Sequence, residues 1–197
     1  MSSKAPIPEF SIFKRIKLYQ LGIKNWDIPT YTTTDELFKL YYLANSLNEK
    51  SVAVEIGSYI GASSLMIGSA LKKDSLLYCI DTWENDAMTE GNWDTFSVFL
   101  KNTASVSDKI KTIKSESVKA AGEFSYLIDY LFIDGDHSYD AVKADTESWF
   151  NKLKIGGLIV MHDISWAEGV IRVVEEDVKP YLSKWGNMPN MFWGWKK

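Results

Sequence analysis

The chain has 197 residues, a length that one hydrophobic core can serve, and its 46% hydrophobic and 24% charged residues are ordinary for a globular domain. Its formal net charge of −4 provides no electrostatic attraction for nucleic acid or an anionic membrane, so neither is expected as a partner. The chain has one cysteine, Cys79, and its first ten residues do not resemble a signal peptide. Both features favour a reducing, cytoplasmic location.

The N-terminal quarter of the chain is predicted to be helical. Residues 9–20 mix apolar and basic side chains as a short amphipathic helix does. A second helix is predicted to begin at Thr34, a suitable N-cap because acidic residues follow it and apolar residues then recur at helical spacing. Residues 1–48 are therefore expected to form a helical cap on a core spanning 51–197, the two making one domain.

From residue 51 onward, short apolar runs alternate with amphipathic segments. Strands are predicted at 51–56, 76–80, 110–113, 129–133, 158–161 and 191–195, and helices at 63–71, 93–103, 117–122, 139–153 and 168–182. The fourth of these helices is expected to be closed by Gly156 and Gly157. Apolar strands that alternate with helices are typical of parallel sheets covered on both faces. The predicted fold is α/β: a Rossmann-like, doubly wound, mostly parallel sheet with helices on both faces and a C-terminal edge strand.

The first predicted strand ends in Glu55 and is followed by Gly57 and Gly61. This G-x-x-x-G spacing differs from the G-x-G-x-x-G of dinucleotide-binding loops. A carboxylate at this point would repel a phosphate and attract a cation, such as the sulfonium of S-adenosylmethionine, with about 3 kcal/mol at about 5 Å. The alternative is a structural glycine turn beside a solvated Glu55.

The second predicted strand ends at Asp81, followed by Trp83. An acid at this strand end can accept two hydrogen bonds from a ribose diol, and an indole ring can cover an adenine. The alternatives are a helix N-cap for Asp81 and a core position for Trp83.

Two further strand ends carry clustered ionisable residues. Asp134, Asp136 and His137 lie within four positions, which favours an acid/base or metal cluster over a turn with capping aspartates. His162 and Asp163 follow the next strand and are expected beside Asp134, where the three could supply nitrogen and oxygen ligands to a divalent metal. The alternative is a pair that hydrogen-bonds loop backbone.

Two segments are predicted to cover a bound substrate, the acceptor of the group that the protein would transfer. Residues 84–95 and 164–168 follow strands and carry Trp93 and Trp166 among polar groups. Because sugars often stack on such rings, a saccharide is one acceptor these segments suggest. The alternative for each tryptophan is packing against its own loop.

The segments VEIGSYIGASS, LYCIDTW and LFIDGDHSYDAVKADTESWFNKLKIGGLIVMHD resemble class I S-adenosylmethionine-dependent methyltransferases. The closest likeness is to the small O-methyltransferases that act on catechols, macrolide sugars and aminocoumarin sugars. It runs over residues 31–163, and IDGDHSYDAVKAD is its most specific part. The resemblance implies O-methylation of a small hydroxylated acceptor, such as a sugar or a natural-product precursor.

The resemblance also implies roles for single residues. The expected cofactor-binding residues are Glu55, Gly57, Ser58, Tyr59, Ser63, Asp81, Trp83, Ser117 and Asp134, with Asp81 at the ribose and Ser117 at the adenine. Asp134, His162 and Asp163 match positions that hold magnesium in metal-dependent members, although those members usually have an acid or an amide where this chain has His162. Asp136 and His137 both match positions of a general base, and His137 is preferred because its ordinary pKa of about 6.5 suits neutral pH.

Two other functions fit a sheet of this kind. One is a nicotinamide-dependent oxidoreductase, against which the missing G-x-G-x-x-G and the acid Glu55 argue. The other is a non-catalytic module that keeps the fold and binds the cofactor, against which the intact cluster of Asp134, Asp136 and His137 argues.

Overall fold

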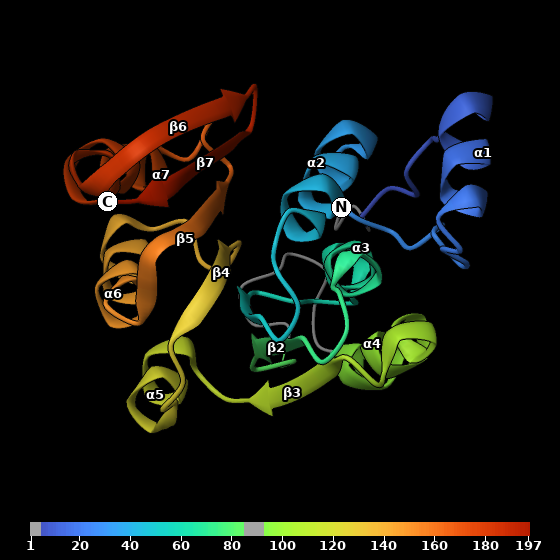
Figure 1. Ribbon diagram of the computed structural model, residues 1–197, viewed down its shortest axis with the longest axis horizontal. Coiled ribbons are helices and arrows are strands. Elements are labelled where there is room, and N and C mark those ends of the chain that lie inside the picture. The colour runs from blue at the N-terminus through green and yellow to red at the C-terminus, as the bar shows by residue number, and fades with distance from the viewer. Residues whose placement is uncertain (1–4, 85–92) are drawn as a thin grey trace.

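The computed structural model describes residues 5–84 and 93–197. Their strands form one seven-stranded sheet in the order β3-β2-β1-β4-β5-β7-β6 (Figure 1). β7 runs antiparallel to both of its neighbours, and every other pairing in the sheet is parallel. The predicted Rossmann-like α/β fold is confirmed.

The elements have the following bounds. The strands are β1 (Val52–Ile56), β2 (Leu76–Asp81), β3 (Ile110–Lys114), β4 (Ile128–Ile133), β5 (Leu153–His162), β6 (Leu182–Met188) and β7 (Met191–Lys196). The α-helices are α1 (Ile12–Gln20), α2 (Thr34–Asn45), α3 (Ala62–Ala70), α4 (Thr95–Asn102), α5 (Ser117–Glu123), α6 (Tyr139–Phe150) and α7 (Glu168–Val173). A π turn (Val174–Val178) and a 3-10 turn (Lys179–Tyr181) prolong α7 up to β6.

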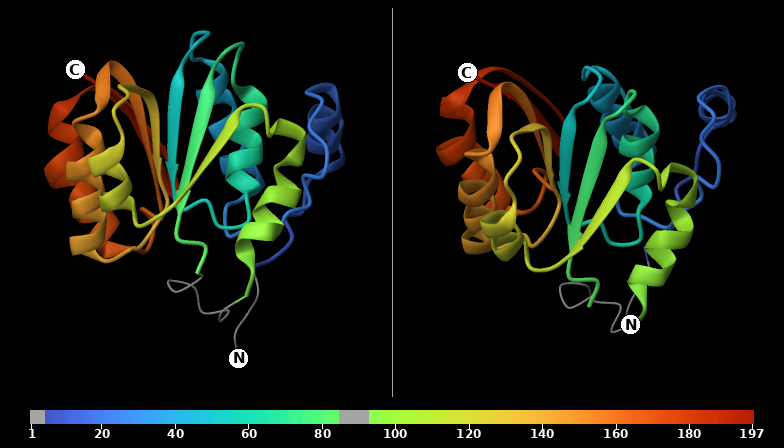
Figure 2. Two further views of the ribbon diagram at one scale, coloured as in Figure 1. Left: turned by 90° about the horizontal axis from the view of Figure 1, so that it is seen from below. Right: turned by 60° about the horizontal axis from the view of Figure 1, so that its bottom comes forward.

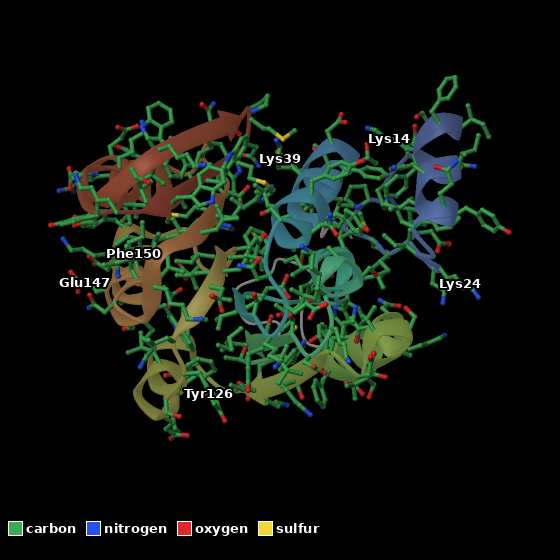
Figure 3. The ribbon with its side chains drawn as sticks, in the orientation of Figure 1. Lys14, Lys24, Lys39, Tyr126, Glu147 and Phe150 are labelled. Carbon is green, nitrogen blue, oxygen red and sulfur yellow. The ribbon has the colours of Figure 1, made fainter. Side chains whose placement is uncertain are left out.

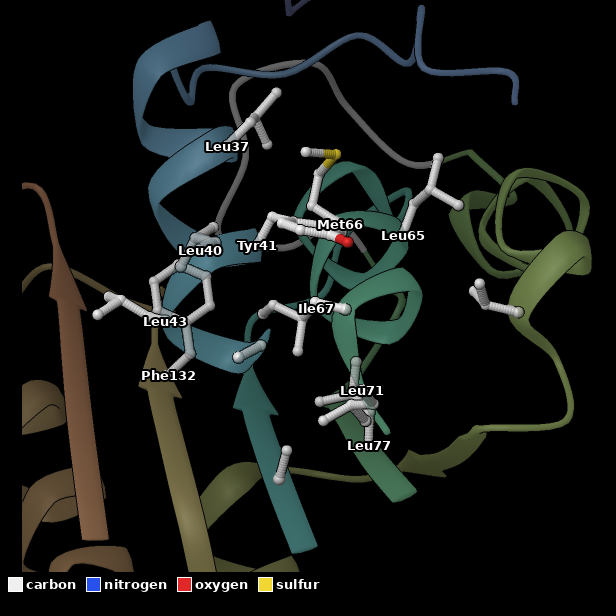
Figure 4. Packing of buried hydrophobic residues seen from close by; sticks show 14 of the residues in the cluster. Leu37, Leu40, Tyr41, Leu43, Leu65, Met66, Ile67, Leu71, Leu77 and Phe132 are labelled. Atoms are coloured by element: carbon white, nitrogen blue, oxygen red, sulfur yellow. The ribbon is translucent and has the colours of Figure 1, made fainter. Parts of the chain in front are cut away.

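The helices form two layers, with α2 and α3 on one face of the sheet and α5, α6 and α7 on the other (Figure 2). Strand periodicity decides which face each side chain meets, since Ala53 of β1 packs on the α2/α3 side and Val54 on the opposite side. Figure 4 shows Leu40 and Leu43 of α2 beside Ile67 of α3 and Phe132 of β4. The two cores hold the strand ends, and with them the site, in place.

Helix α2 begins at a capping box and is connected to β7 by a cation–π contact. The N-cap of α2 is Thr33 rather than Thr34, because the Thr33 hydroxyl accepts from the backbone N–H of Glu36 and the Glu36 carboxylate accepts from that of Thr33. Lys39 of α2 lies 4.3 Å from the ring centroid of Trp193 on β7 (Figure 3).

No helix within residues 5–84 and 93–197 is long and apolar enough to cross a membrane.

The predicted boundary between the helix at 139–153 and the strand that follows it was wrong. The helix that begins at Tyr139 ends at Phe150, and Gly156 and Gly157 lie inside β5 instead of closing the helix. Gly156 has φ +77°, and the pairing of β5 with β4 shifts register between Leu153, opposite Ile128, and Leu158, opposite Tyr130. β6 was not predicted, because its side chains are mostly exposed and polar and show no apolar run.

Candidate functional site

Two adjoining cavities open at the carboxyl ends of the parallel strands, around the point between β1 and β4 where the strand order reverses. The cavity beside Asp81 and Ser117 is called the adenosine-side cavity, after the ligand that the sequence predicts there, and has a volume of about 470 Å³. The cavity beside His137 and Trp166 is called the acceptor-side cavity for the same reason and has a volume of about 530 Å³. Four residues line both: Gly57, Tyr59, Asp134 and Gly135. One molecule can therefore extend from the first cavity into the second past these residues.

The loop after β1 is shaped by residues with left-handed backbone conformations. Gly57 has φ +82°, and a Cβ built on it would lie 2.1 Å from the carbonyl oxygen of Asp134. Tyr59 has φ +44° and Gly61 has φ +92°. Only glycine lets the first loop approach the loop after β4 this closely, and that approach forms the passage between the cavities.

Asp81 joins the loops that follow β1 and β2. One carboxylate oxygen accepts from the backbone N–H of Tyr59 at 2.7 Å and the other from that of Trp83 at 2.7 Å. Asp81 also lines the adenosine-side cavity. Because each carboxylate oxygen has two lone pairs, the group can accept further hydrogen bonds from a diol in the cavity.

Glu55 is fully buried and lines neither cavity, contrary to the expectation that it would face the cofactor. Its position in β1 turns the side chain toward α3, where it accepts hydrogen bonds from Ser58 at 2.8 Å and from Ser64. Burial raises the pKa of Glu55, and the hydrogen bonds of Ser63 and Ser64 oppose that rise. Glu55 therefore positions the loop after β1 through these hydrogen bonds, without lining a cavity itself.

Trp83 does not cover an adenine, because its side chain is buried and lines neither cavity. Its Nε1 donates to the carbonyl oxygen of Tyr59 at 2.8 Å, and its ring lies 4.8 Å from that of Phe96 and 5.1 Å from that of Phe99. Trp83 therefore occupies a core position, which was the alternative to a place beside an adenine.

The other predicted cofactor residues all line a cavity. Ser58 and Ser63 face the acceptor-side cavity, and Ser117 faces the adenosine-side cavity at the start of α5. The Ser117 hydroxyl accepts from Trp149 Nε1 at 2.8 Å and is hydrogen-bonded to Asp145 of α6. Asp145, which the sequence interpretation missed, is buried and lines the same cavity.

We expect Asp145→Asn to stabilise the protein at pH 8 and to have little effect at pH 4. Burial raises the pKa of Asp145 from 3.8 to about 6, so the folded chain binds this proton more tightly than the unfolded chain does. The contribution of this group to the free energy of unfolding is therefore fully present below pH 3.8 and is lost as pH rises to about 6. Above that pH, the buried carboxylate lowers the free energy of unfolding by up to about 3 kcal/mol relative to its protonated form. Urea unfolding of both proteins at the two pH values measures the difference.

The matched control is Asp140→Asn, which removes one exposed carboxylate from the same helix. An Asp145→Asn advantage of equal size at pH 4 and pH 8 would contradict the prediction.

A buried histidine lies among three carboxylates, two at the sheet edge and one on α2. The register that pairs Ile133 with Met161 brings Asp134 beside His162, as predicted. His162 Nδ1 lies 3.1 Å from Asp134 Oδ1 and 3.3 Å from Asp163 Oδ1, and its Nε2 lies 3.4 Å from Glu36 Oε2. Burial by itself lowers the pKa of His162, but Asp134 and the other carboxylates raise it to about 12.

His137 and Asp136, the two candidate bases, face different cavities. His137 lines the acceptor-side cavity, and its Nε2 lies 2.8 Å from Asp163 Oδ2. Asp136 is exposed, lines the adenosine-side cavity, and accepts from the backbone N–H of Ser138 at 2.6 Å. Hydrogen bonding to Asp163 raises the pKa of His137 above 6.5, whereas hydrogen bonding to Ser138 lowers that of Asp136.

The three predicted metal ligands do come together. Asp134, His162 and Asp163 each offer one ligand atom, and these atoms lie within 4.8 Å of one another. The donor set nevertheless fits a magnesium ion poorly, because both nitrogens of His162 are directed at carboxylates and magnesium prefers oxygen ligands. Asp163 Oδ1 also accepts from Trp166 Nε1 at 2.8 Å and from Asn190 Nδ2 at 2.9 Å.

The sequence interpretation missed Glu36 and Asn190. Glu36 is 2% exposed although it stands in the first turn of a helix, where its Thr-x-x-Glu spacing indicates only a capping box. Asn190 lies in the turn between β6 and β7, and β6 was not predicted. Two segments, 84–95 and 164–168, were expected to cover an acceptor. Trp166 of the second segment lies at the acceptor-side cavity, and residues 85–92 of the first fall outside the described ranges.

A family model described as a methyltransferase domain matches residues 54–164, more than half of the chain. The chain belongs to this methyltransferase family. The matched residues include the end of β1, all of β4 and β5, and most of the residues that line the two cavities, whereas Thr30, Tyr31, Thr32, Trp166 and Asn190 lie outside the match. Family membership therefore rests on the same strand ends that form the site.

Individual proteins are similar to this methyltransferase at 14–29% sequence identity. The uncharacterized protein y4gI of Sinorhizobium fredii is 29% identical over 129 residues, which are 62% of this chain and 14% of that protein. The O-methyltransferase TomG of Streptomyces achromogenes, solved with S-adenosylmethionine, has a TM-score of 0.67 at 14% identity, covering 97% of this chain and 92% of TomG. The methyltransferase MycE, solved with magnesium, S-adenosylhomocysteine and mycinamycin VI, has a TM-score of 0.60 at 15% identity, covering 91% and 53%. These structural likenesses show a shared fold.

Proposed function

We propose that this methyltransferase uses S-adenosylmethionine to methylate a hydroxyl oxygen of a small acceptor. The observation that carries the proposal is the pair of joined cavities, one beside Asp81 and the other beside His137. The residues fit the cofactor, because Asp81 offers carboxylate oxygens for a ribose and Ser117 and Asp145 offer polar groups to an adenine edge. TomG and MycE, which share the fold, were solved with S-adenosylmethionine and S-adenosylhomocysteine respectively.

When bound, S-adenosylmethionine supplies an electrophilic methyl carbon on a sulfonium. The part of this chain in the reaction is to hold an acceptor hydroxyl in line with that carbon and to take its proton as the new bond forms. His137 is suited to the second task, because Asp163 fixes Nε2 as the donor and leaves the Nδ1 lone pair to accept the proton. Within the described residues, the one polar contact of the His137 ring is that of Nε2 with the Asp163 carboxylate.

The rim of the acceptor-side cavity favours a polar acceptor with a flat or ring-shaped face. Trp166 and Tyr31 both line it and are 61% and 50% exposed, and Thr30, Thr32 and Asn190 add hydrogen-bonding groups. A saccharide or a sugar-bearing natural product matches this combination of an aromatic surface with hydroxyl and amide groups. MycE, with the same fold, was solved with mycinamycin VI.

Calorimetry with S-adenosylhomocysteine and with NAD tests the cofactor, and methyl transfer to a panel of hydroxylated sugars and phenols tests the reaction. We expect binding of the first compound only, with turnover on at least one sugar. Trp166→Ala should raise the KM of that acceptor by up to about tenfold, because a ring contact contributes about 0.5–1.5 kcal/mol, and should leave cofactor affinity unchanged.

The control is Trp185→Ala, a similarly exposed tryptophan on β6 that lines neither cavity. NAD binding would favour the oxidoreductase. Cofactor binding without turnover on any acceptor would favour the non-catalytic module.

A further inference from the structure

His162 occupies the centre of a closed group of acidic side chains. Asp134 and Asp163 come from the ends of β4 and β5. Glu36, which is 126 residues before His162 in the chain, comes from α2. His162 and Glu36 are 3% and 2% exposed, and Asp163 is 9% exposed. Three carboxylates gathered in a largely buried space repel one another unless a positive charge lies between them.

The His162 ring lies between these carboxylates. An ionised carboxylate can only accept hydrogen bonds, and oxygens of Asp134 and Glu36 lie against the two different nitrogens of the His162 ring. Asn190 Nδ2 also lies 3.5 Å from His162 Nε2, slightly farther than Glu36 Oε2 at 3.4 Å. A ring that donates to both carboxylates carries a proton on each nitrogen and is an imidazolium. An imidazolium has no lone pair left for a metal ion.

We propose that His162 is a built-in cation that takes the place of a divalent metal between Asp134 and Asp163. It holds the two strand-end carboxylates at one place and ties them to the N-terminal helix α2 through Glu36. Asp163 thereby keeps its other oxygen directed at His137, so His162 acts as a positioning residue for the proposed base. The proposal builds on the proposed site but requires neither a known acceptor nor turnover to be tested.

The surroundings of the cluster support a fixed cation over an exchangeable one. The oxygens of Asp163 are already occupied by Trp166, Asn190 and His137. The Glu36 oxygen beside His162 also accepts from the backbone and the hydroxyl of Thr33. A metal ion entering this group would have to displace several of these bonds as well as the ring of His162.

Manganese binding, followed by electron paramagnetic resonance on the purified chain, tests the proposal. The wild-type protein should bind no Mn²⁺ at this site. His162→Asp should gain one site, at least about tenfold tighter than any wild-type binding, because the change removes a positive charge and adds an oxygen ligand. The double change of His162→Asp with Asp163→Asn should lose that site again, which would place the ion at the cluster.

His137→Asp is the matched control, since it replaces the only other histidine of the chain, beside the same Asp163, and should create no comparable site. If His162→Asp does not fold, ¹⁵N chemical shifts of the wild-type histidine rings at pH 7 still decide the question. Two protonated nitrogens on His162 are expected. An unprotonated nitrogen on His162, or one Mn²⁺ per wild-type chain that Asp163→Asn abolishes, would overturn the proposal, whereas failure of methyl transfer would affect only the proposed function.

Discussion

His137→Ala is expected to lower kcat by about 10²–10⁴-fold, the usual contribution of a positioned general base, while the affinity for S-adenosylhomocysteine stays the same. The physical reason is the placement of the side chain. His137 lines the acceptor-side cavity but not the adenosine-side cavity, and its contact with Asp163 leaves Nδ1 for the acceptor proton. Single-turnover methyl transfer and calorimetry measure the two quantities separately.

Asp136→Asn provides the matched control, because Asp136 is the adjacent residue and its carboxylate faces the other cavity. Its kcat should remain within a few-fold of the wild type. A large loss in Asp136→Asn together with a small one in His137→Ala would transfer the role of base to Asp136.

The pH dependence of the reaction should follow the same histidine. The base must be unprotonated, and the hydrogen bond to Asp163 raises the pKa of His137 above its ordinary value of 6.5. The value of kcat/KM should therefore rise with pH and reach half of its maximum above pH 6.5. A plateau that already extends down to pH 5 would argue against His137.

The second large effect is expected for Gly57→Ala, which should weaken cofactor binding by about tenfold or more and destabilise the fold by about 2–4 kcal/mol. The new Cβ would meet the Asp134 carbonyl oxygen at 2.1 Å, a backbone atom that cannot move aside without shifting the loop after β4. The positive φ of +82° adds a cost of its own. Urea unfolding and calorimetry with S-adenosylhomocysteine measure these losses.

Gly22→Ala separates the two causes. Gly22 has a similar φ of +72°, but a Cβ there meets nothing within 4 Å. This variant should lose only about 1–2 kcal/mol of stability and keep its cofactor affinity. If both variants behaved alike, the close approach of the two loops would not be what shapes the passage between the cavities.

The geometry also explains how the site is built from few contacts. Asp81 fixes the loops after β1 and β2 by accepting from their backbone N–H groups. His162 and Asp163 connect the loops after β4 and β5 to α2 and to the turn before β7. Asp81 lines only the first cavity and Asp163 only the second, whereas Asp134 lines both and contacts His162.

The sequence alone determined the alternation of strands and helices, because buried parallel strands have to be continuously apolar and their helices amphipathic. It also indicated that Asp81, Asp134, His137 and His162 belong to one edge, since parallel strands end together there. Only the tertiary structure decided what lies on each side of a strand. Glu55 and Trp83 turn into the core, and Glu36 and Asp145 enter the site from helices, where sequence periodicity says nothing about a contact 126 residues away. Long-range packing, which local patterns do not encode, made that decision.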